Sequence, residues 1–130
     1  MLERTGGCLC GGVRYRVVGS LRPIIYCHCG QCRRTSGHFV AATAADADAL
    51  EIVADESLAW FVSSEHASRG FCRRCGSSLF WRPENGSRIS IMAGTLDNSD
   101  GLAPVEHIYV GAKGEYYELK DDLPKRQGRT

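Results

Sequence analysis

The stretch Gly7-Cys8-Leu9-Cys10-Gly11-Gly12-Val13-Arg14-Tyr15-Arg16-Val17 combines the two features that decide this fold. Its first half places two cysteines two residues apart, and its second half alternates apolar and basic side chains. Residues i and i+2 of an extended strand point to one face, so Cys8 and Cys10 can present two thiols on the same side. The alternation over 13–17 is typical of a half-buried strand. This stretch therefore predicts strands that carry pairs of metal-ligating cysteines.

The remaining cysteines repeat this design in two further clusters. The chain has 7 cysteines, arranged as a C-x-C (Cys8, Cys10), a C-x-C-x-x-C (Cys27, Cys29, Cys32) and a C-x-x-C (Cys72, Cys75). A C-x-x-C on a tight turn brings two sulfurs to one tetrahedral metal. Gly30 and Gly76 lie in or after such turns and permit positive φ there. The clusters predict metal binding more strongly than any one pair would.

Ligand number divides the cysteines into two zinc sites. Structural zinc sites close at four ligands, whereas catalytic sites keep one position open. The simplest division gives Cys8, Cys10, Cys72 and Cys75 to a structural zinc, and Cys27, Cys29 and Cys32 to a catalytic zinc. The first site closes a loop of about 62 residues, which costs about 4 kcal/mol plus a constant. Structural zinc binding supplies about 10–16 kcal/mol and offsets that cost.

The spacing leaves other arrangements open. Cys27 and Cys29 could instead join Cys72 and Cys75 around one metal. The middle cluster could also be three buried thiols without a metal, because free cysteine is often simply buried. A third possibility is a thiol redox protein that uses Cys29 and Cys32, and a fourth is a non-enzymatic zinc module that binds a protein partner.

Short strand-like runs separated by turn residues cover most of the chain and predict a mostly β, antiparallel fold with little helix. Asn85-Gly86 is expected to form a hairpin turn, because both residues tolerate positive φ. Residues 44–50 are expected to form at most a short helical turn, and the polar tail over 121–130 is expected to be loosely ordered. The expected strands cover residues 13–17, 24–26, 39–43, 50–53, 58–62, 79–82, 88–92, 106–110 and 116–119.

Composition limits the class of protein. The chain has 130 residues, which fits a single domain spanning 1–130 with its core over about 6–124. A net charge of +1 argues against a nucleic-acid binder. The sequence has no run of about 18 apolar residues, so no membrane span is expected. The first residues have no apolar core of a signal peptide, so a cytoplasmic, reducing location is expected.

The chain resembles the glutathione-dependent formaldehyde-activating enzymes, whose β-tent zinc fold is shared with the centromere protein V family. The resemblance runs from Gly6 to about Pro124 and includes all seven cysteines. It is carried by the segments Gly7–Tyr15, Cys27–Arg34 followed by Gly37, Arg69–Leu79, Ala93–Asp97, and His107-Ile108.

The resemblance implies an antiparallel β-tent with two Zn²⁺ ions, one structural and one catalytic, divided as above. It also implies a carbon–sulfur lyase that adds glutathione or another small thiol to formaldehyde or a related small aldehyde, giving an S-hydroxymethyl adduct. Cys27, Cys29 and Cys32 would form its catalytic site.

Residue chemistry adds candidates for the other roles. A thiol bound to zinc is deprotonated and could attack an aldehyde carbon. The proton for the resulting alkoxide could come from water or from a side chain: His28, His38, Thr35 or Ser36. His28 would face away from the metal if it lies on a strand, which favours an ordinary packed histidine. The arginines beside the cysteines, Arg33, Arg34, Arg73 and Arg74, could bind a substrate carboxylate or be solvated.

Overall fold

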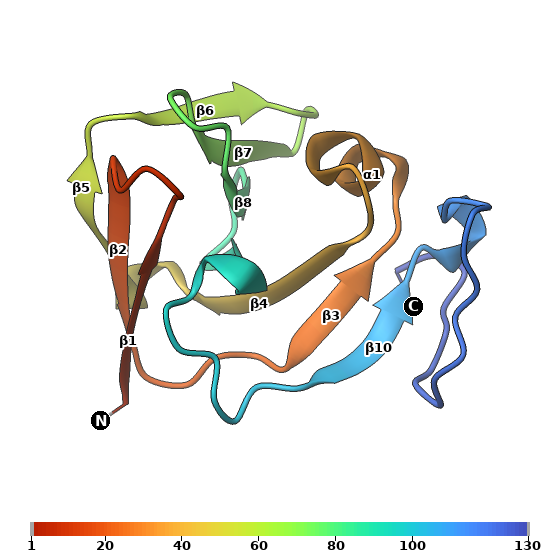
Figure 1. The fold of residues 1–130 in the computed structure, drawn as a ribbon. Helices are drawn as coiled ribbons and strands as arrows, with labels where there is room; N and C mark the ends of the chain where they lie inside the picture. The colour runs from red at the N-terminus through yellow and green to blue at the C-terminus, as the bar shows by residue number, and fades with distance from the viewer. Residues whose placement is uncertain (1, 130) are drawn as a thin grey trace.

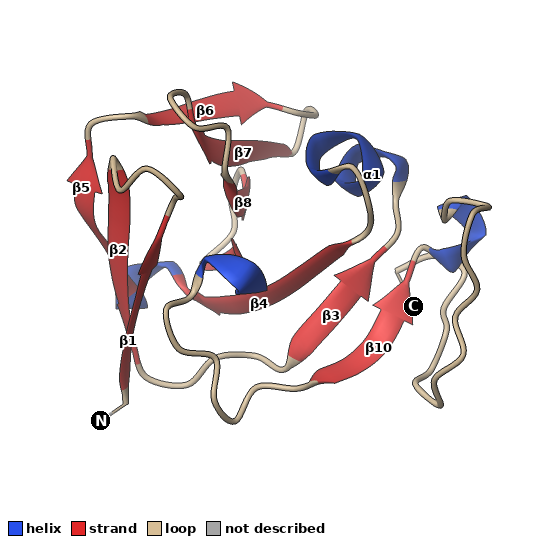
Figure 2. Ribbon diagram, viewed as in Figure 1, coloured by secondary structure: helices blue, strands red, loops and turns tan. Residues whose placement is uncertain are grey.

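The computed structural model describes residues 2–129, in which short strands greatly outnumber helices (Figures 1 and 2). One α-helix, α1 (Gly30–Ser36), and three 3₁₀ turns, η1 (Ala47–Ala49), η2 (Ala93–Thr95) and η3 (Val110–Ala112), interrupt them. No helix within this range is long and apolar enough to cross a membrane. The strands are β1 (Glu3–Gly7), β2 (Val13–Val18), β3 (Ile24–Cys27), β4 (Val40–Asp46), β5 (Leu50–Asp55), β6 (Leu58–Val62), β7 (Ala67–Cys72), β8 (Ser78–Pro83), β9 (Arg88–Met92) and β10 (Pro104–Ile108).

The strands form two sheets (Figure 1). A 3-stranded sheet has the order β1-β2-β5, and a 7-stranded sheet has the order β10-β3-β4-β9-β8-β7-β6. All neighbouring pairs are antiparallel except β10 and β3, which run parallel. The mostly β, largely antiparallel fold predicted from the sequence is confirmed.

The core forms where β2 faces the larger sheet. Its alternating residues Val13, Tyr15 and Val17 are buried, as the period of two predicts. The ring of Tyr15 meets that of Phe80 edge-on, with centroids 5.3 Å apart. The Tyr15 hydroxyl is bonded to Thr95 Oγ1 at 2.8 Å, so the buried ring keeps a polar partner. Burial of this face holds the sheets together and fixes the position of the Cys8–Cys10 segment just before β2.

Most of the expected strands are present, and the exceptions have local causes. Strands β1 and β7 were not predicted, because Glu3–Gly7 has no large apolar residue and β7 contains Arg69 and Gly70. Position 70 of β7 favours glycine, because a Cβ there would lie 3.0 Å from the Trp60 ring. The strand expected over 116–119 is wrong, since this segment has no strand pairing.

The helix α1 was not predicted, because its seven residues are too few to show an apolar stripe. It ends at Gly37, whose φ of 85° suits a glycine C-cap. The short helical turn expected within 44–50 corresponds to η1. The hairpin between β8 and β9 is present, but neither Asn85 nor Gly86 has positive φ, so the expected turn type is wrong.

The C-terminal segment is held against β10, which corrects the expectation of a loose tail. The backbone N–H of His107 donates to Pro124 O at 2.9 Å, and that of Arg126 donates back to His107 O at 2.9 Å. Tyr109 N donates to Gly128 O at 2.9 Å. Polar composition misled the prediction, because this segment is ordered by backbone hydrogen bonds rather than by apolar burial.

Candidate metal centres

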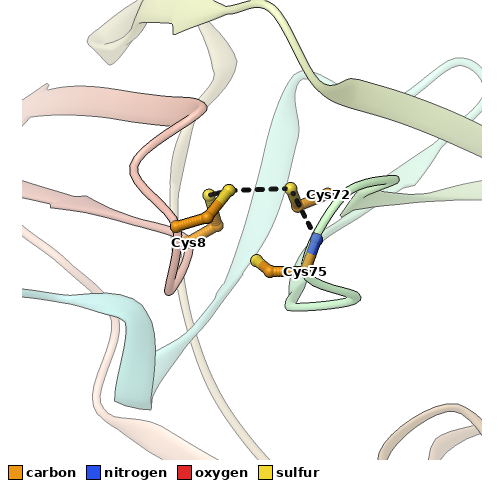
Figure 3. A group of neighbouring side chains, drawn as sticks. Cys8, Cys72 and Cys75 are labelled. Carbon is orange, nitrogen blue, oxygen red and sulfur yellow. Dashed lines mark hydrogen bonds between the residues drawn. The ribbon is translucent and has the colours of Figure 1, made fainter.

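Four cysteines from two distant segments of the chain meet at one point. Cys8 and Cys10 precede β2, Cys72 ends β7, and Cys75 lies in the turn that follows. Their Sγ atoms all lie within 4.8 Å of one another. The Sγ atoms of Cys8 and Cys10 are 3.7 Å apart, and those of Cys10 and Cys72 are 3.6 Å apart. Figure 3 shows Cys8 facing Cys72 and Cys75 across the gap between two segments.

Neighbouring groups hydrogen-bond to three of these sulfurs, and the pKa values of Cys72 and Cys75 are lowered. Val13 N donates to Cys8 Sγ at 3.2 Å, and Cys75 N donates to Cys72 Sγ at 3.4 Å. The Ser57 hydroxyl, which is fully buried, lies 3.0 Å from Cys72 Sγ. Hydrogen bonds from Ser77 lower the pKa of Cys75 to about 5. Donors around the sulfurs favour the charged form that a metal binds.

The other three cysteines lie within one short connection. Cys27 ends β3, Cys29 is the N-cap of α1, and Cys32 is in its first turn. Their Sγ atoms also lie within 4.8 Å of one another, and no fourth histidine, cysteine or carboxylate of residues 2–129 joins them. Cys32 N donates to Cys29 Sγ at 3.3 Å. Hydrogen bonds from Cys27 and Cys32 lower the pKa of Cys29. The swapped arrangement, in which Cys27 and Cys29 join Cys72 and Cys75, is not the one that this fold forms.

The sulfur–sulfur distances in the four-cysteine group fit zinc, and the three sulfurs of the other group also lie within 4.8 Å of one another. A tetrahedral zinc with Zn–S bonds of about 2.3 Å places its sulfurs about 3.8 Å apart. The separations of 3.6 and 3.7 Å in the four-cysteine group lie close to that value. They are far longer than a disulfide bond of about 2.05 Å, and all seven cysteines are free thiols. The four-cysteine group supplies a complete tetrahedral set, and the three-cysteine group supplies three of its four members.

A hollow of about 370 Å³ opens beside the three-cysteine group. Gln31, Arg34 and Thr35 reach it from α1, and Arg69 reaches it from β7. Arg69 is only 7% exposed, and its Nη2 donates to Gln31 Oε1 at 3.3 Å and lies 3.8 Å from Cys32 Sγ. Sequence reasoning gave Arg69 no role, because it is 37 residues from Cys32 along the chain.

The four arginines singled out beside the cysteines have different positions. Arg34 lines the hollow. Arg33 donates from Nε to Ala112 O at 2.9 Å and braces the C-terminal part of the chain. Arg74 pairs with Glu56 at 3.5 Å on the surface, and Arg73 is exposed. Of these four arginines, only Arg34 lines the hollow.

His28 belongs to a buried polar chain. Its Nδ1 is 2.6 Å from the Tyr117 hydroxyl, and its Nε2 is 2.8 Å from His107 Nδ1. His107 Nε2 in turn lies 2.8 Å from a carboxylate oxygen of Asp121. Burial and the neighbouring His107 lower the pKa of His28 to about 4. His28 is therefore a packed histidine, as predicted, although it lies just after β3 rather than on a strand. It is packed within a network that ties the Cys27–Cys29 segment to the C-terminal segment.

The other candidate proton donors are already engaged. Thr35 Oγ1 donates to Gln31 O at 2.9 Å, and Ser36 Oγ donates to Cys32 O at 2.7 Å. His38 is exposed and bonds through Nδ1 to the Tyr116 hydroxyl. These contacts engage the hydroxyls of Thr35 and Ser36 and one ring nitrogen of His38.

The family model for glutathione-dependent formaldehyde-activating enzymes matches residues 3–112. The chain belongs to this family. The matched range contains all seven cysteines and Arg69, whereas Tyr117 and Asp121 lie beyond it.

Relatives agree with this assignment. A provisionally named glutathione-dependent formaldehyde-activating enzyme of Halomonas elongata is 30% identical over 126 residues, covering 88% of this chain and 80% of that protein. An uncharacterized lyase of Schizosaccharomyces pombe is 30% identical over 87 residues, covering 66% of this chain and 62% of that protein. The crystal structure of a Rhodobacter sphaeroides protein superposes with a TM-score of 0.61 at 27% identity, covering 77% of this chain and 97% of that one.

Proposed function

We propose that this protein is a zinc-dependent carbon–sulfur lyase that adds a small thiol, glutathione first among them, to formaldehyde or a related small aldehyde. The product is the S-hydroxymethyl adduct, and the reaction is reversible. Membership of the formaldehyde-activating family supports this assignment. The observation that carries it is the difference between the two cysteine groups: four sulfurs in one and three in the other.

The three sulfurs of Cys27, Cys29 and Cys32 would hold a catalytic zinc, and Cys8, Cys10, Cys72 and Cys75 would hold a structural one. Zinc bound to three thiolates would take a substrate thiol as its fourth ligand and keep it deprotonated at neutral pH. Three thiolates already donate strongly to the metal, so binding a further sulfur suits this donor set better than generating hydroxide does.

The chemical step is the addition of a thiolate to an aldehyde. The sulfur electron pair forms the new carbon–sulfur bond, the carbonyl π pair moves to oxygen, and that oxygen takes up one proton. The protein's part is to hold the sulfurs and shape the approach. Cys29 is fixed as the N-cap of α1, and Arg69 places a positive charge beside Cys32. Water supplies the proton, because the hydroxyls of Thr35 and Ser36 donate to backbone carbonyls.

The test combines metal content with exchange kinetics. Protein purified without chelator should hold two zinc ions per chain, and it should speed exchange between free formaldehyde and its glutathione adduct in a two-dimensional NMR exchange experiment. The Cys29→Ser variant should hold one zinc and give the uncatalysed exchange rate. One zinc in the unmodified protein, with Cys27, Cys29 and Cys32 freely alkylated in the folded state, would overturn the enzyme assignment and favour a zinc-binding module for a protein partner.

A further inference from the structure

We propose that the hollow between α1 and β7 binds a carboxylate group carried by the substrate thiol, through Arg69 and Arg34. This inference rests on the proposed function and specifies its substrate class: thiols that bear a carboxylate are preferred over neutral or cationic thiols. The hollow is lined by residues of α1, β6 and β7 and by Ser63, which follows β6. Figure 1 shows that the end of β6 and the start of β7 lie on the side of α1.

Arg69 is buried, and its guanidinium is only partly hydrogen-bonded. Its side chain is almost completely buried, and its Nε is buried with no hydrogen-bond partner. No carboxylate of residues 2–129 lies within ion-pair distance of Arg69 or Arg34. The contacts with Cys32 Sγ and Gln31 Oε1 use Nη2 alone, and an anion entering the hollow would add a partner for the rest of this buried guanidinium.

The hollow is lined by two arginines and by no acidic residue. Two guanidinium groups meet there with the polar side chains of Gln31, Thr35 and Ser63, and no acidic residue lines it. A planar guanidinium matches a carboxylate through paired N–H donors. Gln31 holds Arg69 in place, because its Oε1 accepts from Arg69 Nη2 while its Nε2 donates to Ser63 O at 3.1 Å. Arg69 is therefore held in place before a ligand arrives.

Arg69 also lies close to the three-cysteine group. Arg69 Nη2 is 3.8 Å from Cys32 Sγ, so the same side chain faces the cysteine group and the hollow. A ligand whose sulfur is held at the three cysteines would reach the hollow with its next few atoms. The carboxylate and the thiol are accordingly expected on one molecule rather than on two.

The test compares thiols of matched size and different charge: 3-mercaptopropionate, 2-mercaptoethanol and cysteamine. Isothermal titration of the metal-containing protein should show 3-mercaptopropionate binding at least about ten-fold tighter than the other two, as expected for a charge-assisted contact. Arg34→Gln should abolish most of this preference and leave 2-mercaptoethanol binding unchanged. Arg69→Lys keeps the charge but loses the fork, and should reduce the preference. Arg16→Gln, which removes an equal charge from the smaller sheet, should leave it intact.

The outcomes separate this inference from the proposed function. Equal binding of the three thiols, or an equal loss in Arg34→Gln and Arg16→Gln, would overturn the carboxylate site even if the protein speeds exchange with formaldehyde. A preference for 3-mercaptopropionate that Arg34→Gln removes would support the site even if no aldehyde is used. If Arg69→Lys fails to fold, thiol binding to the Arg34→Gln variant still tests the site, because Arg34 is exposed.

Discussion

The two cysteine groups use one ligand chemistry in opposite ways. The four-cysteine group joins residues 62 positions apart and is braced by buried Ser57. The three-cysteine group is confined to six consecutive residues, and a hollow lies beside it. A long-range site stabilises the fold by closing a large loop, whereas a local site constrains little of the chain. Under the proposed function, the number of sulfurs and the length of chain that they enclose together distinguish a structural site from a catalytic one.

The largest effect on stability is expected from Cys75→Ser. This change removes one ligand from the group that ties the N-terminal segment to β7, so the folding energy supplied by the metal is lost. We expect poor solubility, or a Tm lowered by at least about 15 °C, measured by circular dichroism. A Tm equal to that of the unmodified protein would show that the four-cysteine group has no structural role.

A packing change beside the same group should have a smaller effect. A Cβ on Gly12 would lie 2.2 Å from Ser57 Oγ, and Ser57 is buried against Cys72. Gly12→Ala should therefore destabilise the protein by about 1–3 kcal/mol in urea unfolding, the usual cost of overpacking. Gly94→Ala is the matched control, because a Cβ there meets nothing within 4 Å. Equal stability of the two variants would mean that the packing between Gly12 and Ser57 yields without cost.

The polar chain behind the three-cysteine group can be tested by deleting one oxygen. Tyr117→Phe leaves the buried Nδ1 of His28 without its partner, which should cost about 1 kcal/mol of unfolding free energy. Tyr116→Phe deletes the same atom from the neighbouring residue, whose partner His38 is exposed to water. That control should change stability by less than about 0.5 kcal/mol. A control as destabilising as Tyr117→Phe would argue against a special role for the buried chain.

The smallest effect on stability, with the largest effect on chemistry, is expected from Cys29→Ser. The three sulfurs lie so close in sequence that their metal constrains little of the fold. We expect a Tm within about 5 °C of the unmodified value, one zinc instead of two, and no catalysed exchange. If Cys29→Ser unfolds the protein while Cys75→Ser leaves it folded, the roles of the two groups are reversed.

Spacing along the chain predicted the features that depend on neighbouring residues. The alternation in 13–17 predicted β2, and the cysteine spacing predicted the two groups of sulfurs that the fold brings together. The same reasoning placed His28 away from the reaction, because both of its ring nitrogens are engaged elsewhere.

Features built from distant residues were beyond such reasoning. His28 and His107 are 79 positions apart, and Arg69 meets Gln31 across 38. No local pattern distinguishes these side chains from ordinary surface residues, because their burial is created by the tertiary fold. The C-terminal segment was misjudged for a related reason, since its order depends on backbone groups of β10.

The parallel pairing of β10 with β3 also sets an order of events during synthesis. A chain emerges from the ribosome N-terminus first, and its early parts begin to fold before the rest is made. All four sulfurs of the first group are available once Cys75 has emerged, but β3 and His28 wait for residues 104–121. The four-cysteine group can thus assemble early in synthesis, and the surroundings of the three cysteines are completed last. Under the proposed function, a chain that stalls before residues 104–121 emerge would lack the complete surroundings of its catalytic site.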